Sequence, residues 1–117
     1  MEIYKFDKNS GKKISKFGSD FIMSRIIQTD KAANIGCMYL EEDGLVGYHP
    51  AVVPQLLLVL SGSGSVRGES EEYFNVESGD AVFWVKGEWH ETKSENGLTA
   101  IVIESEELNP SLFMETE

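Results

Sequence analysis

The sequence has little cysteine, proline or histidine: one, three and two residues, respectively, among 117. A single cysteine, Cys37, cannot form a disulfide within the chain, and its apolar neighbours predict a buried, unreactive thiol. No stretch approaches the roughly 18 consecutive apolar residues of a membrane-spanning helix. Charged side chains interrupt residues 1–13, so no export signal is expected there. These absences favour a cytoplasmic protein.

Positive charge is also scarce. Ten basic side chains stand against twenty acidic ones, which gives a formal net charge of −10. A surface of this sign repels nucleic acid phosphates and anionic lipid headgroups. We therefore expect neither a nucleic acid partner nor a membrane partner.

What is present indicates one globular domain over residues 1–117, because 41% of the side chains are apolar and the length suits one core. The apolar runs are short and lack helical spacing, which predicts an all-β fold. Residues 61–64 and 77–80 are expected to form turns, and the strand number suits a sandwich or small barrel. The expected strands are 21–27, 35–40, 55–60, 62–67, 73–76, 81–85, 89–94 and 98–105.

Asn96-Gly97 is the preferred centre of a two-residue type I′ hairpin. Such a turn would pair residues 89–94 with 98–105 and place Thr92 opposite Ile101. His90 would then share an apolar face with Ile101, so its side chain is expected to point into the barrel. An inward histidine needs a hydrogen-bonding partner or a metal ion.

The segment 56–60 is apolar at every position, as expected for a strand between a core and a subunit interface. This favours a homodimer that associates through residues 56–60. If the period of two holds from His49 onward, then Ala51, Gln55 and Leu57 lie on the same face as His49.

Residues 49–62, HPAVVPQLLLVLSG, resemble the first sequence motif of the cupin family in the spacing of His49, Gln55 and Gly62. Residues 79–94 resemble the second motif, with Gly79, Gly87 and His90 at its glycine and histidine positions. The resemblance covers about residues 44–104. It implies a cupin jelly roll, which is a double-stranded β-helix barrel.

The resemblance also implies where a metal would bind. Metal-binding cupins commonly use three histidines and one glutamate, but Ala51 replaces the second histidine here and Gln55 replaces the glutamate. The implied ligands are therefore His49, His90 and Gln55, and the cofactor is either none or Zn, Fe, Mn or Ni. An amide oxygen brings no charge and binds such ions weakly.

A carboxylate from elsewhere could complete a face of two histidines and one carboxylate. Glu88 and Glu91 are the nearest in sequence to His90. In a regular strand, however, Glu91 points to the opposite side from His90.

Two functions remain open at this point, and so does the question of whether the chain is an enzyme. The first is binding of a small-molecule ligand, as in the sensing barrels of sugar-responsive regulators that the chain resembles. The expected pocket residues are His49, Gln55, Leu57, His90, Thr92 and Ile101. The alternative is a metal-dependent isomerase or dioxygenase of the cupin type that uses His49 and His90. Metal-free catalysis with His90 as general acid or base is a third possibility.

Two other groups of residues receive a structural interpretation. Trp84 and Trp89 are expected to pack as core or interface anchors rather than to stack on a ligand. The acidic clusters 69–72 and 104–107 are expected to be solvated charges.

Overall fold

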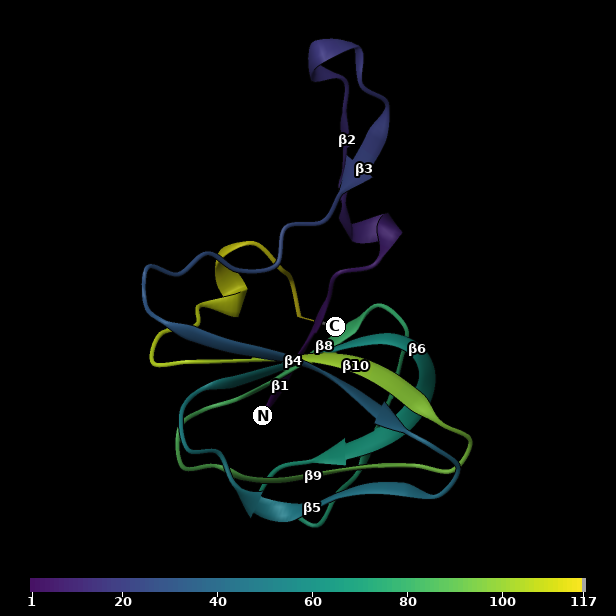
Figure 1. Cartoon of the computed structure of the whole chain (residues 1–117), viewed down its shortest axis with the longest axis vertical. Coiled ribbons are helices and arrows are strands. Elements are labelled where there is room, and N and C mark those ends of the chain that lie inside the picture. Colours follow the sequence, from purple (N-terminus) through teal and green to yellow (C-terminus); the bar gives the residue numbers. More distant parts are fainter. Residues whose placement is uncertain (117) are drawn as a thin grey trace.

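The computed structural model describes residues 1–116 and consists almost entirely of antiparallel strands (Figure 1). The strands are β1 Glu2–Lys5, β2 Lys12–Ile14, β3 Phe21–Met23, β4 Ala33–Leu40, β5 Gly44–Pro50, β6 Gln55–Arg67, β7 Phe74–Glu77, β8 Asp80–Trp84, β9 Trp89–Ser94 and β10 Leu98–Ser105. Three single-turn 3-10 helices span Lys8–Ser10, Lys16–Gly18 and Pro110–Leu112. The expectation of an all-β jelly roll is confirmed.

Eight of the strands form two layers that share β6. One layer has the order β1-β8-β6-β10-β4, and it uses the first half of β6. The second half of β6 pairs with β7 and β9, and β9 pairs in turn with β5. β2 and β3 pair only with each other and stand outside the barrel.

The two strands and the turn expected over residues 55–67 are a single strand of 13 residues, so that prediction is wrong. Gly62 has a φ of +79°, and the register with β10 shifts between Thr99 and Ala100. A glycine in this conformation bends the strand at a bulge instead of reversing it. The bend carries β6 from one layer into the other.

The hairpin expected at Asn96-Gly97 is also wrong, because β9 and β10 do not pair. A type I′ turn needs positive φ at both central residues, but only Gly97 has it, at 110°. The Ser94 hydroxyl accepts a hydrogen bond from Gly97 N at 2.9 Å and donates one to Ser63 O at 2.6 Å. At this turn the chain leaves the layer of β9 and enters the layer of β10.

The apolar residues form two clusters on opposite faces of the β1-β8-β6-β10-β4 layer. The cluster between the layers contains Leu40, Leu57, Val59, Val66, Val76, Val82, Trp84, Leu98 and Ala100. The cluster on the outer face contains Tyr4, Leu56, Leu58, Ala81, Phe83, Ile103, Leu108 and Met114. Alternation along β6 therefore sends successive leucines into different clusters.

The outer cluster changes the interpretation of residues 56–60. Leu56 and Leu58 are buried there against Leu108 and Met114, which come from the segment after β10. These leucines are covered within their own chain. This burial contradicts a subunit interface at Leu56 and Leu58, and the homodimer itself stays a prediction.

Cys37 is exposed, so the prediction of a buried thiol is wrong. It lies on β4, which pairs only with β10 among the described strands and so has a free edge. Ile35 and Tyr39 lie two residues on either side of Cys37 and are exposed as well. The outer cluster does not extend over this end of the sheet.

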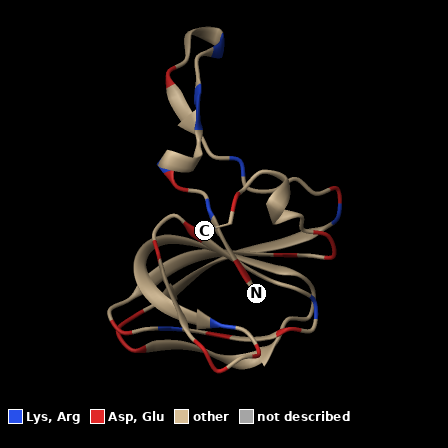
Figure 2. Cartoon of the chain, turned by 180° about the vertical axis from the view of Figure 1, so that it is seen from behind, with Lys and Arg blue, Asp and Glu red and all other residues tan. Residues whose placement is uncertain are grey.

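Figure 2 shows acidic residues spread over the loops and strands of the barrel, in agreement with the net charge of −10. Within residues 1–116, no helix has the length and hydrophobicity needed to cross a membrane.

Candidate functional site

His90 is fully buried in the barrel interior. Burial alternates along β9, where His90, Thr92 and Ser94 point inward. The strands beside β9 are β5 and β6, and Thr92 lies opposite Val66 of the inner cluster. His90 and Thr92 therefore point inward as expected, but the reason is the pairing of β9 with β5 and β6 and not a hairpin with β10.

The His90 ring stacks on the indole of Trp84, with ring centroids 4.5 Å apart and planes inclined by 28°. His90 Nε2 and Trp84 Nε1 are both buried, and neither has a hydrogen-bond partner. They are the two such side-chain atoms within residues 1–116. Buried polar atoms in native proteins usually have a partner. The stacked pair is thus an exception among the buried polar side chains of residues 1–116.

The other nitrogen of the ring settles the tautomer of His90. Its Nδ1 lies 3.2 Å from Glu88 O, and a carbonyl oxygen can only accept, so Nδ1 carries the proton. Burial lowers the pKa of His90, and the nearby His49 lowers it further, while the Glu88 carbonyl and the charge of Glu104 act in the opposite direction. Neutral His90 thus presents the lone pair of a buried Nε2.

His49 lies opposite His90 in the β5–β9 register, with ring centroids 4.4 Å apart. Its Nδ1 is 2.6 Å from Gly47 O, so His49 has the same tautomer and also leaves Nε2 available. Unlike His90, it is exposed to solvent. The strands thus bring together the two histidines of the sequence motifs, one buried and one at the surface.

Gln55 and Leu57 lie on the inner face of β6, as the period of two predicts. Leu57 belongs to the inner cluster, and Gln55 is buried opposite Trp84 of β8. Gln55 also lies opposite Glu104 of β10. Since directly opposed residues share a face of a sheet, these polar groups lie on the same face as the indole that His90 stacks on.

Sequence reasoning missed Glu104, which was expected to be a solvated charge. It is half-buried, and its charge acts on the pKa of His90. The period of two that places Leu98 and Ala100 inside also places Glu104 on the inner face. That alternation was the signal that could have identified it.

Ile101 does not belong with the other expected pocket residues. It lies opposite Leu58 and packs against the outer cluster, on the other face of the sheet from Leu57. Its assignment to the pocket depended on the β9–β10 pairing, which does not form. Placing Ile101 in the pocket is therefore a wrong prediction.

Glu88 and Glu91, the carboxylates considered as further metal ligands, are both occupied. Glu88 accepts hydrogen bonds from the Met1 amino group at 2.7 Å and from Val85 N at 3.1 Å. Glu91 points outward, as expected, and accepts from Tyr73 and from Arg67. The hydrogen bond from Tyr73 is the main cause that lowers the pKa of Glu91.

The residues around His90 do not form an adequate metal cage. No cluster of three or more His, Cys, Asp or Glu side chains in the described part of the chain could hold an ion. The other oxygen donors on this face are the uncharged amide of Gln55 and the carboxylate of Glu104, which does not form an ion-binding group with the two histidines. What the arrangement does offer is one hydrogen-bond acceptor, His90 Nε2, beside one donor, Trp84 Nε1–H.

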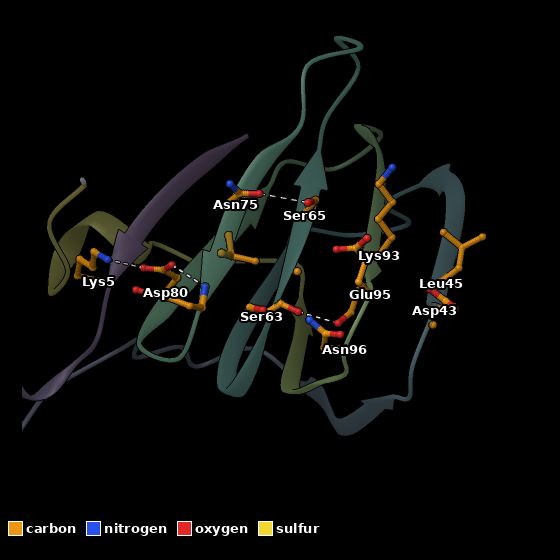
Figure 3. Close-up of a pocket in the computed structure, with 15 residues that line it drawn as sticks. Lys5, Asp43, Leu45, Ser63, Ser65, Asn75, Asp80, Lys93, Glu95 and Asn96 are labelled. Atoms are coloured by element: carbon orange, nitrogen blue, oxygen red, sulfur yellow. Dashed lines mark hydrogen bonds and ion pairs between the residues drawn. The ribbon is translucent and has the colours of Figure 1, made fainter.

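A polar groove of about 870 Å³ lies elsewhere on the molecule (Figure 3). Neither histidine lines it. Several of its polar groups already bind one another: Ser65 Oγ lies 3.3 Å from Asn75 Oδ1, and Lys5 Nζ lies 2.6 Å from Asp80 Oδ1. The groove therefore lacks the unpartnered buried atoms that distinguish the His90 site.

The two tryptophans differ in environment. Trp84 is fully buried in the inner cluster, as expected for a core anchor. Trp89 is partly exposed and lies near Tyr48, with ring centroids 5.2 Å apart. It provides a second indole outside the candidate site.

No protein-family model matches the chain, and no curated protein sequence matches it either. Solved structures do match. A cupin superfamily protein from Desulfitobacterium hafniense has a TM-score of 0.60 at 14% identity, covering 68% of this chain and 72% of that one. An RmlC-like cupin from Shewanella frigidimarina has a TM-score of 0.60 at 15% identity, covering 68% and 70%.

A further match is described as a predicted oxalate decarboxylase from Thermotoga maritima. It has a TM-score of 0.56 at 20% identity and covers 61% of this chain and 64% of that one. Similarity at these identities is evidence of the fold, and function has to be argued from the site itself. Together with the two-layered topology and the position of His49 and His90, these matches show that the chain has the fold of a small cupin.

Proposed function

We propose that this cupin-fold chain binds a small polar organic molecule beside His90 and Trp84, without a metal ion. The observation that carries the proposal is the stacked pair of ring nitrogens, His90 Nε2 and Trp84 Nε1, both buried and both without a partner. Leaving a buried donor or acceptor unpaired costs about 1–3 kcal/mol. A bound ligand that pairs both atoms recovers this energy.

The chemistry of the pair defines the ligand class. Trp84 Nε1–H can only donate, whereas neutral His90 accepts at Nε2. One hydroxyl group, one protonated carboxyl group or one primary amide can both accept from the indole and donate to the imidazole. The side chains of the inner cluster around the pair are apolar, which suits a ligand with a short carbon skeleton.

The ligand would enter at the end of the barrel that holds His49. His49 is exposed, as are Asn34 and Gly36 of β4. Gly36 lies opposite Val102, which packs against the inner cluster. This part of β4 is therefore open to solvent on the face that it directs toward the barrel interior. Gln55 and Glu104 provide further polar groups on the same face.

Thermal unfolding in the presence of simple probe compounds tests the proposal. Glycerol and a monosaccharide supply hydroxyl groups, acetamide supplies a primary amide, and lactate supplies a hydroxyl group beside a carboxylate. A bound ligand raises the unfolding temperature. We expect stabilisation of the native chain that Trp84→Phe abolishes, because this substitution removes the indole N–H and keeps an aromatic ring. Trp89→Phe is the matched control and should retain the response. An equal loss in both variants would contradict the proposal.

A second candidate function, metal-dependent catalysis, is favoured by one observation. His49 and His90 both direct Nδ1 to a backbone carbonyl, which is the arrangement that leaves Nε2 available for a metal. The ligand set lacks a third His, Cys, Asp or Glu among the described residues. We therefore rank this function below metal-free binding.

Elemental analysis of untagged protein separates the two candidates. The binding proposal predicts a metal content far below one equivalent, which the substitutions His49→Ala and His90→Ala leave unchanged. Near one equivalent of metal that is lost in both variants would establish the second candidate instead.

A further inference from the structure

Residues 8–24 form an arm that projects from the barrel (Figure 1). Its strands β2 and β3 pair with each other, from Lys12↔Met23 to Ile14↔Phe21, and with no other described strand. The 3-10 turn Lys16–Gly18 forms its tip. An isolated two-stranded hairpin is marginally stable in water at best. Packing against another surface would therefore stabilise the arm.

The arm exposes apolar side chains. Phe17 at its tip is fully exposed, at 102%, and Phe21, Ile22 and Met23 are each exposed by 44–47%. Phe17 has a φ of 59°, a conformation that is unfavourable for a bulky residue. Exposed apolar groups clustered in this way are typical of a protein–protein contact.

Charge is separated between the arm and the rest of the chain, and the basic segments on the arm are visible in Figure 2. The arm has four lysines against Asp20, a net charge of +3. The remaining residues have six basic and 19 acidic side chains, a net charge of −13. A second copy of the chain would therefore offer the arm a body of opposite charge.

The barrel carries a matching apolar strip on the outer face of β4. We define the β4 strip as Ile35, Cys37 and Tyr39, which lie at alternating positions and are all exposed, Ile35 by 67% and Tyr39 by 74%. β4 also has a free edge. The charged groups near the ends of the strip are Asp30, Lys31, Glu41, Glu42, Asp43, Glu106 and Glu107, of which six are acidic.

We propose that two copies of the chain exchange arms, so that the arm of each copy lies on the β4 strip of the other. The apolar side chains of the arm would cover Ile35 and Tyr39, and its lysines would face the acidic residues at the ends of β4. The arm points away from its own barrel (Figure 1), so a second copy provides the contact that its own β4 does not. This interface is independent of the proposed ligand.

Sedimentation of the untagged chain over a wide concentration range tests the proposal. We expect a reversible dimer that Phe17→Asn and Ile35→Ser each weaken by roughly tenfold or more, as the loss of a buried apolar side chain requires. Asparagine tolerates positive φ, so Phe17→Asn preserves the turn. Val52→Ser removes another exposed apolar group and is the control that should not change the dimer. A monomer at all concentrations, or a dimer unaffected by Phe17→Asn and Ile35→Ser, would overturn the proposal.

Cross-linking tests the geometry directly, because Cys37 on the β4 strip is the only native cysteine. Phe17→Cys should produce disulfide-linked dimers under mild oxidation, and adding Cys37→Ser should abolish them. Val52→Cys, the control, should not link to Cys37. Dimers of Phe17→Cys that persist without Cys37 would place two arm tips together and contradict the exchange. If the chain stays monomeric and binds phosphatidylserine vesicles, the arm contacts membranes instead, and the proposal of arm exchange is overturned.

Discussion

His90 and Trp84 stack with their ring centroids 4.5 Å apart, and each leaves one buried ring nitrogen without a hydrogen-bond partner. The inner cluster supplies no hydrogen-bonding group to either atom, and Gln55 and Glu104 on the same face do not bond to them. Burial also keeps His90 neutral by lowering its pKa. The pair therefore combines an acceptor and a donor in a place shielded from water, which is the basis of the proposed binding function.

The lowered pKa of His90 makes the stability of the fold depend on pH. Its folded-state pKa lies below the unfolded value of about 6.5, so the unfolded chain binds the proton more readily. The contribution is fully present above about pH 6.5 and is lost as the pH falls through the lower folded-state pKa. Urea unfolding at a series of pH values should show this loss, and His90→Gln should reduce it. His49→Gln should keep most of the dependence, because burial is its largest cause and His49 adds a smaller part; identical curves for the native chain and His90→Gln would refute the explanation.

Leu57 is fully buried in the inner cluster, so its truncation should be costly. We expect Leu57→Ala to lower the free energy of unfolding by about 2–5 kcal/mol, since it leaves a cavity between the layers. Leu45→Ala on the exposed side of β5 is the matched control, with a change within about 0.5 kcal/mol. Chemical denaturation measures both. Similar losses in the two variants would show that the inner cluster is not the main core.

Gly62 is required where β6 passes between the layers. A Cβ there would lie 2.2 Å from Gly97 O, and the φ of +79° disfavours any other residue. Gly62→Ala should therefore destabilise the fold by more than about 1 kcal/mol. Gly36→Ala, in a strand position where a Cβ meets no atom within 4 Å, should be close to neutral or stabilising. Thermal unfolding of the two variants checks this, and the reverse ranking would contradict the bend in β6.

The hydrogen bond from Tyr73 to Glu91 can be tested by titration. It is the largest cause that lowers the pKa of Glu91, ahead of the contribution from Arg67. Tyr73→Phe removes the hydroxyl group and should raise the pKa of Glu91 toward its ordinary value. A pH titration followed by NMR of the Glu91 side chain measures the change. A pKa that stays the same would mean that the two groups are not bonded in solution.

The sequence was most informative where local pattern and packing agree. The strands expected over 35–40, 89–94 and 98–105 became β4, β9 and β10 with small changes of boundary. The spacing of His49 and His90 also located two residues that lie opposite each other across β5 and β9. In these segments, alternation decides both the strand and the face that it buries.

Prediction failed where the outcome depended on non-local pairing. Asn96-Gly97 favours a hairpin locally, but pairing of β10 with β4 and β6 prevailed, and this moved Ile101 to the outer face. Gly62 was interpreted as a turn because a single sequence does not distinguish a bend from a reversal. The arm was missed because only residues 21–23 of the expected strand 21–27 pair, and they pair with β2. The burial of Leu56 and Leu58 depends on a distant segment at the other end of the chain.

The most direct test of the binding site is the indole N–H signal of Trp84 in a two-dimensional proton–nitrogen NMR spectrum. The chain has two tryptophans, so two indole signals are expected, and Trp84→Phe assigns them. When the stabilising probe compound is added, the account predicts a large shift of the Trp84 signal, with the Trp89 signal nearly unchanged. A probe that stabilises the chain but shifts only Trp89, or neither signal, would contradict binding at the His90–Trp84 pair.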